Sequence, residues 1–446
     1  MCRSRTAIAV VIACVGVIAL SLSAVAQSEL RIVRPVDGAT VRETVSILVP
    51  VSCVPMNPDP GFIACSIDGV YEAASAEKSE DGRYFVWRWD TKAVQYSPET
   101  GQPKGRPKEG KHTIVVQAYS AEKNSGSGKK FGNPAQITVY VKNSASADMP
   151  AGGLKLRYNH TVGSANDYKF RYVENLKSIE GATDFTRALG EAIEGAEGVV
   201  RRSIEDVIDR GSYLVRQKLQ GTLQLYFAGR AIPADIASKS EYHVEDSLGH
   251  TTYVMSSSSP GMPIGVDLPI LPSKSVKIDD TWSEPMKLFK YALTGESARL
   301  MSTSKLEGLE WEGGYPCAKI TTTFGGIVRV PSSTLLTKPL SLTGEATTYF
   351  AYRIGKVVSF TVKAYAEPEL DQKDLESLKQ ALVSSKNVPG TPGGPGVMLE
   401  ENETGLPQSG RESYGPSLRN LGSSRGSSGQ TVKVKMEFAQ SLRLVD

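Results

Sequence analysis

Hydrophobic and polar positions alternate along much of the chain with a period of two residues, which is typical of half-buried β-strands. In the first third of the chain, turn-forming residues separate four such runs, at 45–51, 84–89, 112–118 and 136–141. No strong helical period interrupts them. The pattern therefore predicts an N-terminal β-sandwich over residues 29–143.

A second set of alternating runs begins after residues 144–153, which we interpret as a linker. These runs follow one another closely, and hairpin turns are predicted at 246–249 and 352–355. This meander order predicts one large curved antiparallel sheet, a half-barrel, in a domain spanning 154–446. The predicted strands are 154–158, 168–172, 213–219, 223–227, 240–245, 251–255, 287–293, 318–324, 346–352 and 357–365.

Two segments of the second domain favour short helices. Apolar residues recur near helical spacing from Thr183 to Ala196, although Gly190 and Gly195 disfavour a helix. We expect a short helix there, then a strand to Asp209 and a turn at Arg210-Gly211. A second short helix is predicted over 371–384.

The chain between residues 387 and 430 is dominated by Gly, Pro and Ser. Such a composition buries too little apolar surface to order itself, so we predict a disordered insertion. Residues 431–438 then alternate cleanly, which predicts a last strand that returns to pair with the sheet.

The N-terminus carries the features of a secretory signal peptide. Arg3 and Arg5 precede an apolar stretch, and small residues end at Ala26, so residues 1–26 are predicted to be removed on export. An uncleaved anchor and lipidation at Cys14 are the alternatives. After cleavage the chain would contain no transmembrane segment, which places the protein in the periplasm, the outer envelope or the extracellular space.

Composition narrows the function classes. The 446 residues are 40% hydrophobic, and 51 Lys and Arg stand against 48 Asp and Glu, for a formal charge of +3. This composition excludes a wholly disordered chain and a multi-span membrane protein. The interspersed charges lack the basic footprint of a nucleic-acid-binding protein.

Three cysteines follow the signal segment. Cys53 and Cys65 bracket a proline-rich loop, which a disulfide could close in an oxidising compartment, with a stabilisation of about 2–3 kcal/mol. A metal pair is the alternative, but no further Cys or His lies nearby to complete it. Cys317 has no partner motif and is interpreted as a buried, inert thiol.

The first domain resembles a known family through Ile32-x-x-Pro35-x-x-Gly38-x-x-Val41, Trp89-Asp90-Thr91, Glu109 to Ile114, Ala118 and Val139-x-Val141-x-Asn143. This series is similar to the bacterial immunoglobulin-like modules found on exported proteins. The resemblance implies an immunoglobulin-like sandwich with Trp89 in the core and a structural His112 at a strand start. Such modules usually act as spacers or adhesive units.

The second domain resembles a group of uncharacterised exported bacterial proteins. The resemblance is carried by Leu271-Pro272, Val276 to Trp282, Gly344-Glu345, Tyr349-Phe350 and Gly355. The group's signature is a proline, then a valine and Gly-Asp-Trp; here Asp279 replaces the usual glycine. That group looks like the open half-barrel of lipoprotein carriers, whose concave face can hold an acyl chain. In this reading Trp282 covers the core or the barrel mouth.

Candidate chemistry is sparse. Nucleotide-binding loops, the hydrolase Gly-x-Ser-x-Gly elbow and the His-Glu-x-x-His zinc motif are all missing from the sequence, and no cofactor is predicted. His243 and His250 flank a predicted hairpin and could form a metal pair with neighbouring carboxylates, but a third compelling ligand is missing. No catalytic residue is nominated.

We therefore expect an exported, non-enzymatic envelope or extracellular protein. Its half-barrel would bind an amphiphile or a partner protein. A purely structural component of an assembly, and a metal-dependent hydrolase centred on His243 and His250, are the alternatives.

Overall fold

The protein is mainly β, as predicted, and divides into two compact units, Met1–Ser144 and Ala145–Asp446. The computed structural model describes residues 29–55, 61–96, 103–105, 107, 109–121, 128–179, 192–227, 230–234, 240–256, 267–288, 298–328, 340–367, 369–371 and 431–445. The predicted signal segment 1–26, the second predicted helix beyond Asp371 and the predicted insertion 387–430 lie outside these residues. Within the described ranges, no helix has the length and apolarity needed to cross a membrane.

The first unit is a sandwich of two sheets. One sheet has the order β1-β9-β8-β3-β4, in which β1 and β9 run parallel, and the other pairs β2 with β5. A short β6–β7 ribbon lies apart from both. The strands are β1 Ala39–Val41, β2 Thr44–Pro50, β3 Phe62–Ile67, β4 Val70–Ser75, β5 Tyr84–Asp90, β6 Gln95–Tyr96, β7 Pro103–Gly105, β8 Gly110–Ala121 and β9 Gly128–Val141.

Alternation along these strands builds the core of the sandwich. Ile47 and Phe85 come from one sheet, and Ile63 and Ile114 come from the other; all four are fully buried in one apolar cluster. Trp89 belongs to the same cluster, as expected. At the end of β5, the Thr91 hydroxyl donates a hydrogen bond to the Glu43 carbonyl and so ties the two ends of the paired strands together.

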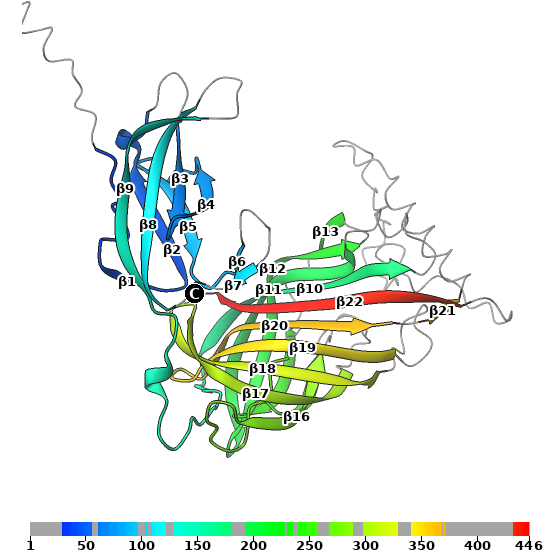
Figure 1. Ribbon diagram of the computed structural model, residues 1–446. Coiled ribbons are helices and arrows are strands. Elements are labelled where there is room, and N and C mark those ends of the chain that lie inside the picture. The colour runs from blue at the N-terminus through cyan, green and yellow to red at the C-terminus, as the bar shows by residue number, and fades with distance from the viewer. Residues whose placement is uncertain are drawn as a thin grey trace, which may run out of the picture. The chain divides into compact units, whose positions relative to one another are not determined.

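The second unit is built on one large antiparallel sheet that does not close (Figure 1). Its main path has eleven strands in the order β15-β14-β12-β11-β10-β22-β20-β19-β18-β17-β16, while β13 pairs with β12 and β21 with β22. The strands are β10 Ala165–Ile179, β11 Ala192–Asp209, β12 Ser212–Phe227, β13 Arg230–Ala234, β14 Ser240–Asp246, β15 Thr251–Ser256, β16 Thr281–Leu288, β17 Ala298–Glu312, β18 Tyr315–Val328, β19 Leu340–Ala351, β20 Lys356–Ala366, β21 Glu369–Asp371 and β22 Thr431–Val445.

The last strand occupies the middle of this sheet. Strand β22 pairs with β10 on one side and with β20 on the other (Figure 1). It therefore joins the half of the meander that comes first in the chain, β10 to β15, to the half that follows, β16 to β20. The prediction that the segment after residue 430 returns to the sheet is confirmed.

The two ends of the half-barrel differ. Tight turns connect β11 to β12, β14 to β15, β17 to β18 and β19 to β20, and all four lie at one end of the strands, which we call the turn end. At the opposite end, the connections fall largely outside the described residues. The predicted turns at 210–211, 246–249 and 352–355 are confirmed.

Residues 154–160, which we call the cap segment, lie against the turn end. The backbone N–H groups of Tyr158 and Asn159 donate to the carbonyls of Ser247 and Gly355 in two different hairpin turns. Leu154, Leu156 and Tyr158 are buried in the main core of the unit. The sequence-based prediction of a strand at 154–158 was wrong: only an isolated bridge from Leu154 to Val276 forms.

Two glycines allow this close approach. Gly249 and Gly355 have φ of 90° and 66°, and a Cβ atom would lie 2.9 Å from the Tyr158 ring in the first case and 2.5 Å from the Asn159 nitrogen in the second. Only a residue without a side chain fits both the backbone conformation and the space.

The predicted helix from Thr183 to Ala196 needs correction. Residues 192–196 belong to β11, where Gly195 lies so close to β10 that a Cβ would meet the Tyr172 carbonyl oxygen at 2.5 Å. Gly195 is therefore explained by cross-strand packing, while residues 183–191, with Gly190, lie outside the described residues. In the part of the chain that the structure describes, helical residues occur only in the 3-10 turns Val51–Cys53 and Ser146–Asp148.

We predict that Gly355→Ala destabilises the protein more than Gly314→Ala. Both glycines lie in hairpin turns at the turn end with positive φ, but nothing lies within 4 Å of a Cβ at Gly314. Gly314→Ala should cost about 1–2 kcal/mol from the backbone conformation alone. Gly355→Ala should cost about 1–3 kcal/mol more, because the cap segment must move. Denaturant melts of the two variants measure this difference, and equal losses would contradict the role given to the cap segment.

We also predict that proteolytic cleavage between residues 387 and 430 leaves the two fragments associated. The composition of this segment predicts accessibility to proteases, and β22 pairs along its length with β10 and β20. After limited digestion, the fragments should co-elute on size exclusion and separate only in denaturant. A control chain that ends at residue 430 exposes two unpaired strand edges and should be insoluble.

Candidate functional site

The face of the large sheet that carries the main core, which we call the inner face, has an apolar centre. It runs across β10, β22, β20 and β19, where opposite residues share a face of the sheet. Small side chains are frequent on β19 and β20: Ala346 and Ala364 are buried there, and the Phe324 ring packs directly over Gly344. The larger inner-face residues of this centre are Tyr168, Phe170, Tyr172, Phe438, Leu442, Phe360 and Val362.

One side of this centre, on β16 to β18, carries uncharged polar groups. The Ser304 and Thr322 hydroxyls lie 2.8 Å apart, and Ser302 donates to the Glu284 carbonyl. Trp282, opposite Ser304 on the edge strand, packs against the core as the sequence predicted. Its indole nitrogen is buried and finds no hydrogen-bond acceptor among the described residues.

The other side, on β11, β12 and β14, is charged and nevertheless buried. Arg202, Gln217, Glu241, His243 and Glu245 all point to the inner face and are at most 4% exposed. The alternation places them there: Arg202 lies opposite Gln217, and Gln217 lies opposite Glu241. Charges that are removed from water need partners, so their contacts define the site.

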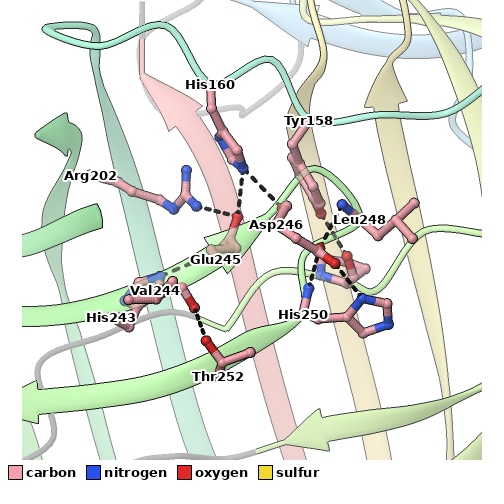
Figure 2. A network of polar contacts seen from close by, with 11 residues as sticks. Tyr158, His160, Arg202, His243, Val244, Glu245, Asp246, Leu248, His250 and Thr252 are labelled. Atoms are coloured by element: carbon pink, nitrogen blue, oxygen red, sulfur yellow. Dashed lines mark hydrogen bonds and ion pairs between the residues drawn. The ribbon is translucent and has the colours of Figure 1, made fainter. Parts of the chain in front are cut away.

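Glu245 is the centre of these contacts (Figure 2). One carboxylate oxygen accepts a 2.5 Å hydrogen bond from Arg202 Nη2 and lies 3.4 Å from Nε2 of His160. The other oxygen lies 3.2 Å from Nε2 of His243. Three elements therefore converge on one carboxylate: β11, β14 and the cap segment.

One contact also places a proton on a ring nitrogen of His160. His160 Nε2 lies 3.0 Å from the Asp246 carbonyl oxygen, which only accepts, so this nitrogen carries a proton. The imidazole is enclosed by two aromatic rings, Tyr158 stacked at 6.1 Å and Tyr213 edge-on at 4.7 Å. Its side chain is 1% exposed.

Burial and neighbouring charges shift the pKa values of Glu245, His160 and Tyr168. Burial would raise the pKa of Glu245, but Arg202 and His243 together hold this pKa well below its ordinary value, so the carboxylate is ionised. Burial lowers the pKa of His160, and Arg202 adds to this effect, although Glu245 opposes it. Burial raises the pKa of Tyr168 to about 12.

The Arg202–Glu245 pair is less complete than a neighbouring exposed pair. Arg201 binds Asp167 through both Nε and Nη2, at 2.8 and 2.7 Å. Arg202 uses Nη2 on Glu245, while its Nε has no hydrogen-bond partner among the described residues. A buried ion pair with an unsatisfied donor is costly, so raw stability does not explain why it is there.

The structure does not bring the two predicted metal candidates to one site. His243 contacts Glu245 on the inner face, whereas Nδ1 of His250 binds Asp246 at 2.8 Å in the following turn (Figure 2). No group of three or more His, Cys, Asp or Glu residues within the described ranges is arranged to hold a metal ion. His112 pairs with Asp68 at the start of β8 in the other unit.

The predicted disulfide does not form in this structure. Cys53 and Cys65 are both buried, but they are not joined. Cys53 lies in the 3-10 turn after β2, and Cys65 points from β3 into the sandwich core, where burial raises the pKa of its thiol to about 12. Cys317 is buried beside Ala351 of β19 and Val358 of β20, so its predicted burial is confirmed.

Sequence reasoning missed the residues that matter most in the charged cluster. Arg202, Glu245 and His160 come from distant parts of the chain and carry no motif. Two patterns could have revealed Arg202 and Glu245. In Val200-x-Arg202-x-Ile204, a charged residue stands between two apolar residues of the buried face, and in Glu241-x-His243-x-Glu245 three polar residues in alternation occupy that face.

Comparisons with known proteins add no family. Neither the family models nor the curated proteins contain a match to this chain.

We predict that Arg202 and Glu245 are strongly coupled. Arg202→Met or Glu245→Leu alone should cost about 3–5 kcal/mol, because each leaves a buried charge or donor without its partner. The double variant Arg202→Met/Glu245→Leu should cost less than either single change. A double-mutant cycle by urea denaturation tests this, with Arg201→Met and Asp167→Leu as the exposed control pair, expected to couple by less than about 1 kcal/mol. Additive losses at the buried pair would contradict the prediction.

Proposed function

We propose that this chain is an exported, non-enzymatic binding protein whose half-barrel holds an amphiphile on its inner face. The first unit would serve as an immunoglobulin-like spacer or adhesive module. The observation that carries the proposal is the composition of the inner face, which combines an apolar centre with polar groups at both sides.

The apolar centre supplies the surface for an acyl chain. Ligand sites for apolar molecules are concave and mostly apolar, with a few placed polar groups. The small residues Ala346 and Ala364 lie on this face, and Ala364 is opposite the larger Phe438. A chain of methylene groups laid there would gain about 0.8 kcal/mol for each CH₂ that it buries.

The polar sides supply contacts for a headgroup. The hydroxyls of Ser302, Ser304 and Thr322 and the indole N–H of Trp282 lie on one side, and the Glu245 cluster lies on the other. The cap segment fills the turn end with Leu154, Leu156 and Tyr158. A bound chain would therefore extend toward the opposite end of the strands.

Two further features support export and a modular role. The segment 1–26 has the charge, apolar stretch and small residues of a signal peptide. In the first unit, Trp89 lies in the core, as the resemblance implies. Parallel pairing of β1 with the last strand β9 is compatible with an immunoglobulin-like module.

The proposal predicts that the purified full-length protein carries a copurifying amphiphile. Native mass spectrometry should show an added mass of a lipid or fatty acid, and organic extraction should release it. Ala346→Leu should lower occupancy about tenfold, because overpacking the inner face costs about 1–3 kcal/mol. Glu345→Leu, at the next residue on the outer face, is the matched control and should leave occupancy unchanged.

Thermal melts establish first that both variants are folded. If Ala346→Leu is unfolded, displacement of a fluorescent fatty acid from the wild-type protein by unlabelled lipids replaces the comparison. Absence of any bound lipid, together with no binding of the fluorescent probe, would refute the proposal.

A further inference from the structure

All three histidines of the second unit gather at the turn end. His160 contacts Glu245 and the Asp246 carbonyl, His243 contacts Glu245, and His250 contacts the Asp246 carboxylate (Figure 2). The chain has only four histidines in total. Histidine is the side chain whose charge ordinarily changes between pH 5 and 8, so this gathering concentrates acid sensitivity at one place.

His160 differs from the other two because it belongs to the cap segment. His243 and His250 lie on the β14–β15 hairpin itself, so their contacts stay within that hairpin. The contacts of His160 instead join the cap segment to the last two residues of β14, Glu245 and Asp246. Two backbone hydrogen bonds lie next to these contacts. The N–H of Tyr158 donates to the Ser247 carbonyl, and the N–H of Asn159 donates to the Gly355 carbonyl.

We propose that His160 is an acid-sensitive latch, which holds the cap segment on the turn end while its imidazole is neutral and releases it when the imidazole takes up a proton. The inference stands on the geometry of the junction and does not depend on the amphiphile. It gives the half-barrel a second opening, at the end that the cap segment fills.

The charged groups around His160 set the direction of the effect. Glu245 and Asp246 from β14 favour a proton on the imidazole, while Arg202 from β11 disfavours it. Tyr158 from the cap segment and Tyr213 from β12 contribute rings that exclude water. Burial outweighs the carboxylates, so the pKa of His160 in the latched state is below its ordinary value of 6.5.

The sign of the pH dependence follows from this shift. In the released state the imidazole is in water, where its pKa returns to 6.5. The released state therefore binds the proton more tightly than the latched state. The advantage of the latched state is complete above pH 6.5 and decreases as the pH falls through that value toward the lower pKa of the latched imidazole.

Hydrogen exchange of the full-length protein tests the latch. At pH 5.5, after correction for intrinsic exchange, amides of residues 156–160 should exchange severalfold faster relative to pH 7.5. The limit is about tenfold for each unit by which the pKa is depressed. His160→Gln keeps an N–H donor for the Asp246 carbonyl but does not titrate, so its cap segment should exchange equally at both pH values.

His250→Gln, on the same turn, and His112→Gln, in the first unit, are the controls, and both should keep the wild-type pH response. An unchanged cap segment in the wild-type protein, or a pH response that survives in His160→Gln, would overturn the proposal. If His160→Gln does not fold, the imidazole resonance of His160 in the wild-type protein decides: it should titrate below pH 6.5, and titration at or above that value would overturn the proposal. Lipid occupancy is read separately and does not enter this test.

Discussion

The second unit depends on the pairing of β22 between β10 and β20. Without this strand the large sheet separates into two pieces, β10 to β15 and β16 to β20, each with a long unpaired edge. The strand arrives after a chain segment of about sixty residues, but the entropy of closing a loop grows only with the logarithm of its length. Twelve residues of β22 pair with β10 and eight pair with β20, and this pairing offsets that cost, so a long insertion is compatible with a single continuous sheet.

An open sheet of this size has two edges and must bury one face. The short turns lie at one end, and there the cap segment covers the inner face with Leu154, Leu156 and Tyr158. This arrangement requires close approach to two turns, which explains glycine at positions 249 and 355. The fold thus has a filled end and an apolar centre, and the polar groups divide into an uncharged side and a charged side.

How much of this structure the sequence predicts depends on how far apart in the chain the interacting residues lie. Strands such as β14 and β20 alternate cleanly because one face is buried, so the half-barrel and its hairpin turns were predicted correctly. The region near Gly195 was misassigned to a helix because its glycines serve cross-strand packing, which local spacing does not reveal. Asp279 has a φ of 73°, in the left-handed region that favours glycine, and local spacing does not reveal this conformation either.

The candidate site was less predictable than the fold for a related reason. Glu245 is contacted by residues 43 and 85 positions earlier in the chain, and such contacts have no periodicity to detect. His243 and His250 attracted interest because they are close in sequence, yet alternation and the turn direct them to different carboxylates. The histidine that joins separate elements is His160, which comes just after the segment 154–158 that was wrongly expected to be a strand.

The buried ion pair is explained by the positions that it imposes on the residues around it. Replacing such a pair by apolar residues of similar volume is often neutral or stabilising, so its presence adds little to the free energy of folding. What Glu245 does provide is a fixed acceptor for Arg202, His243 and His160 at once. An apolar side chain at position 245 would fill the same space, but without directional hydrogen bonds it would not hold the cap segment in one position. A carboxylate with three donors accepts one position, while the burial of the His160 imidazole makes that position depend on protonation. The contacts of Glu245 therefore set where the cap segment lies, and the burial of His160 sets under which conditions it stays there.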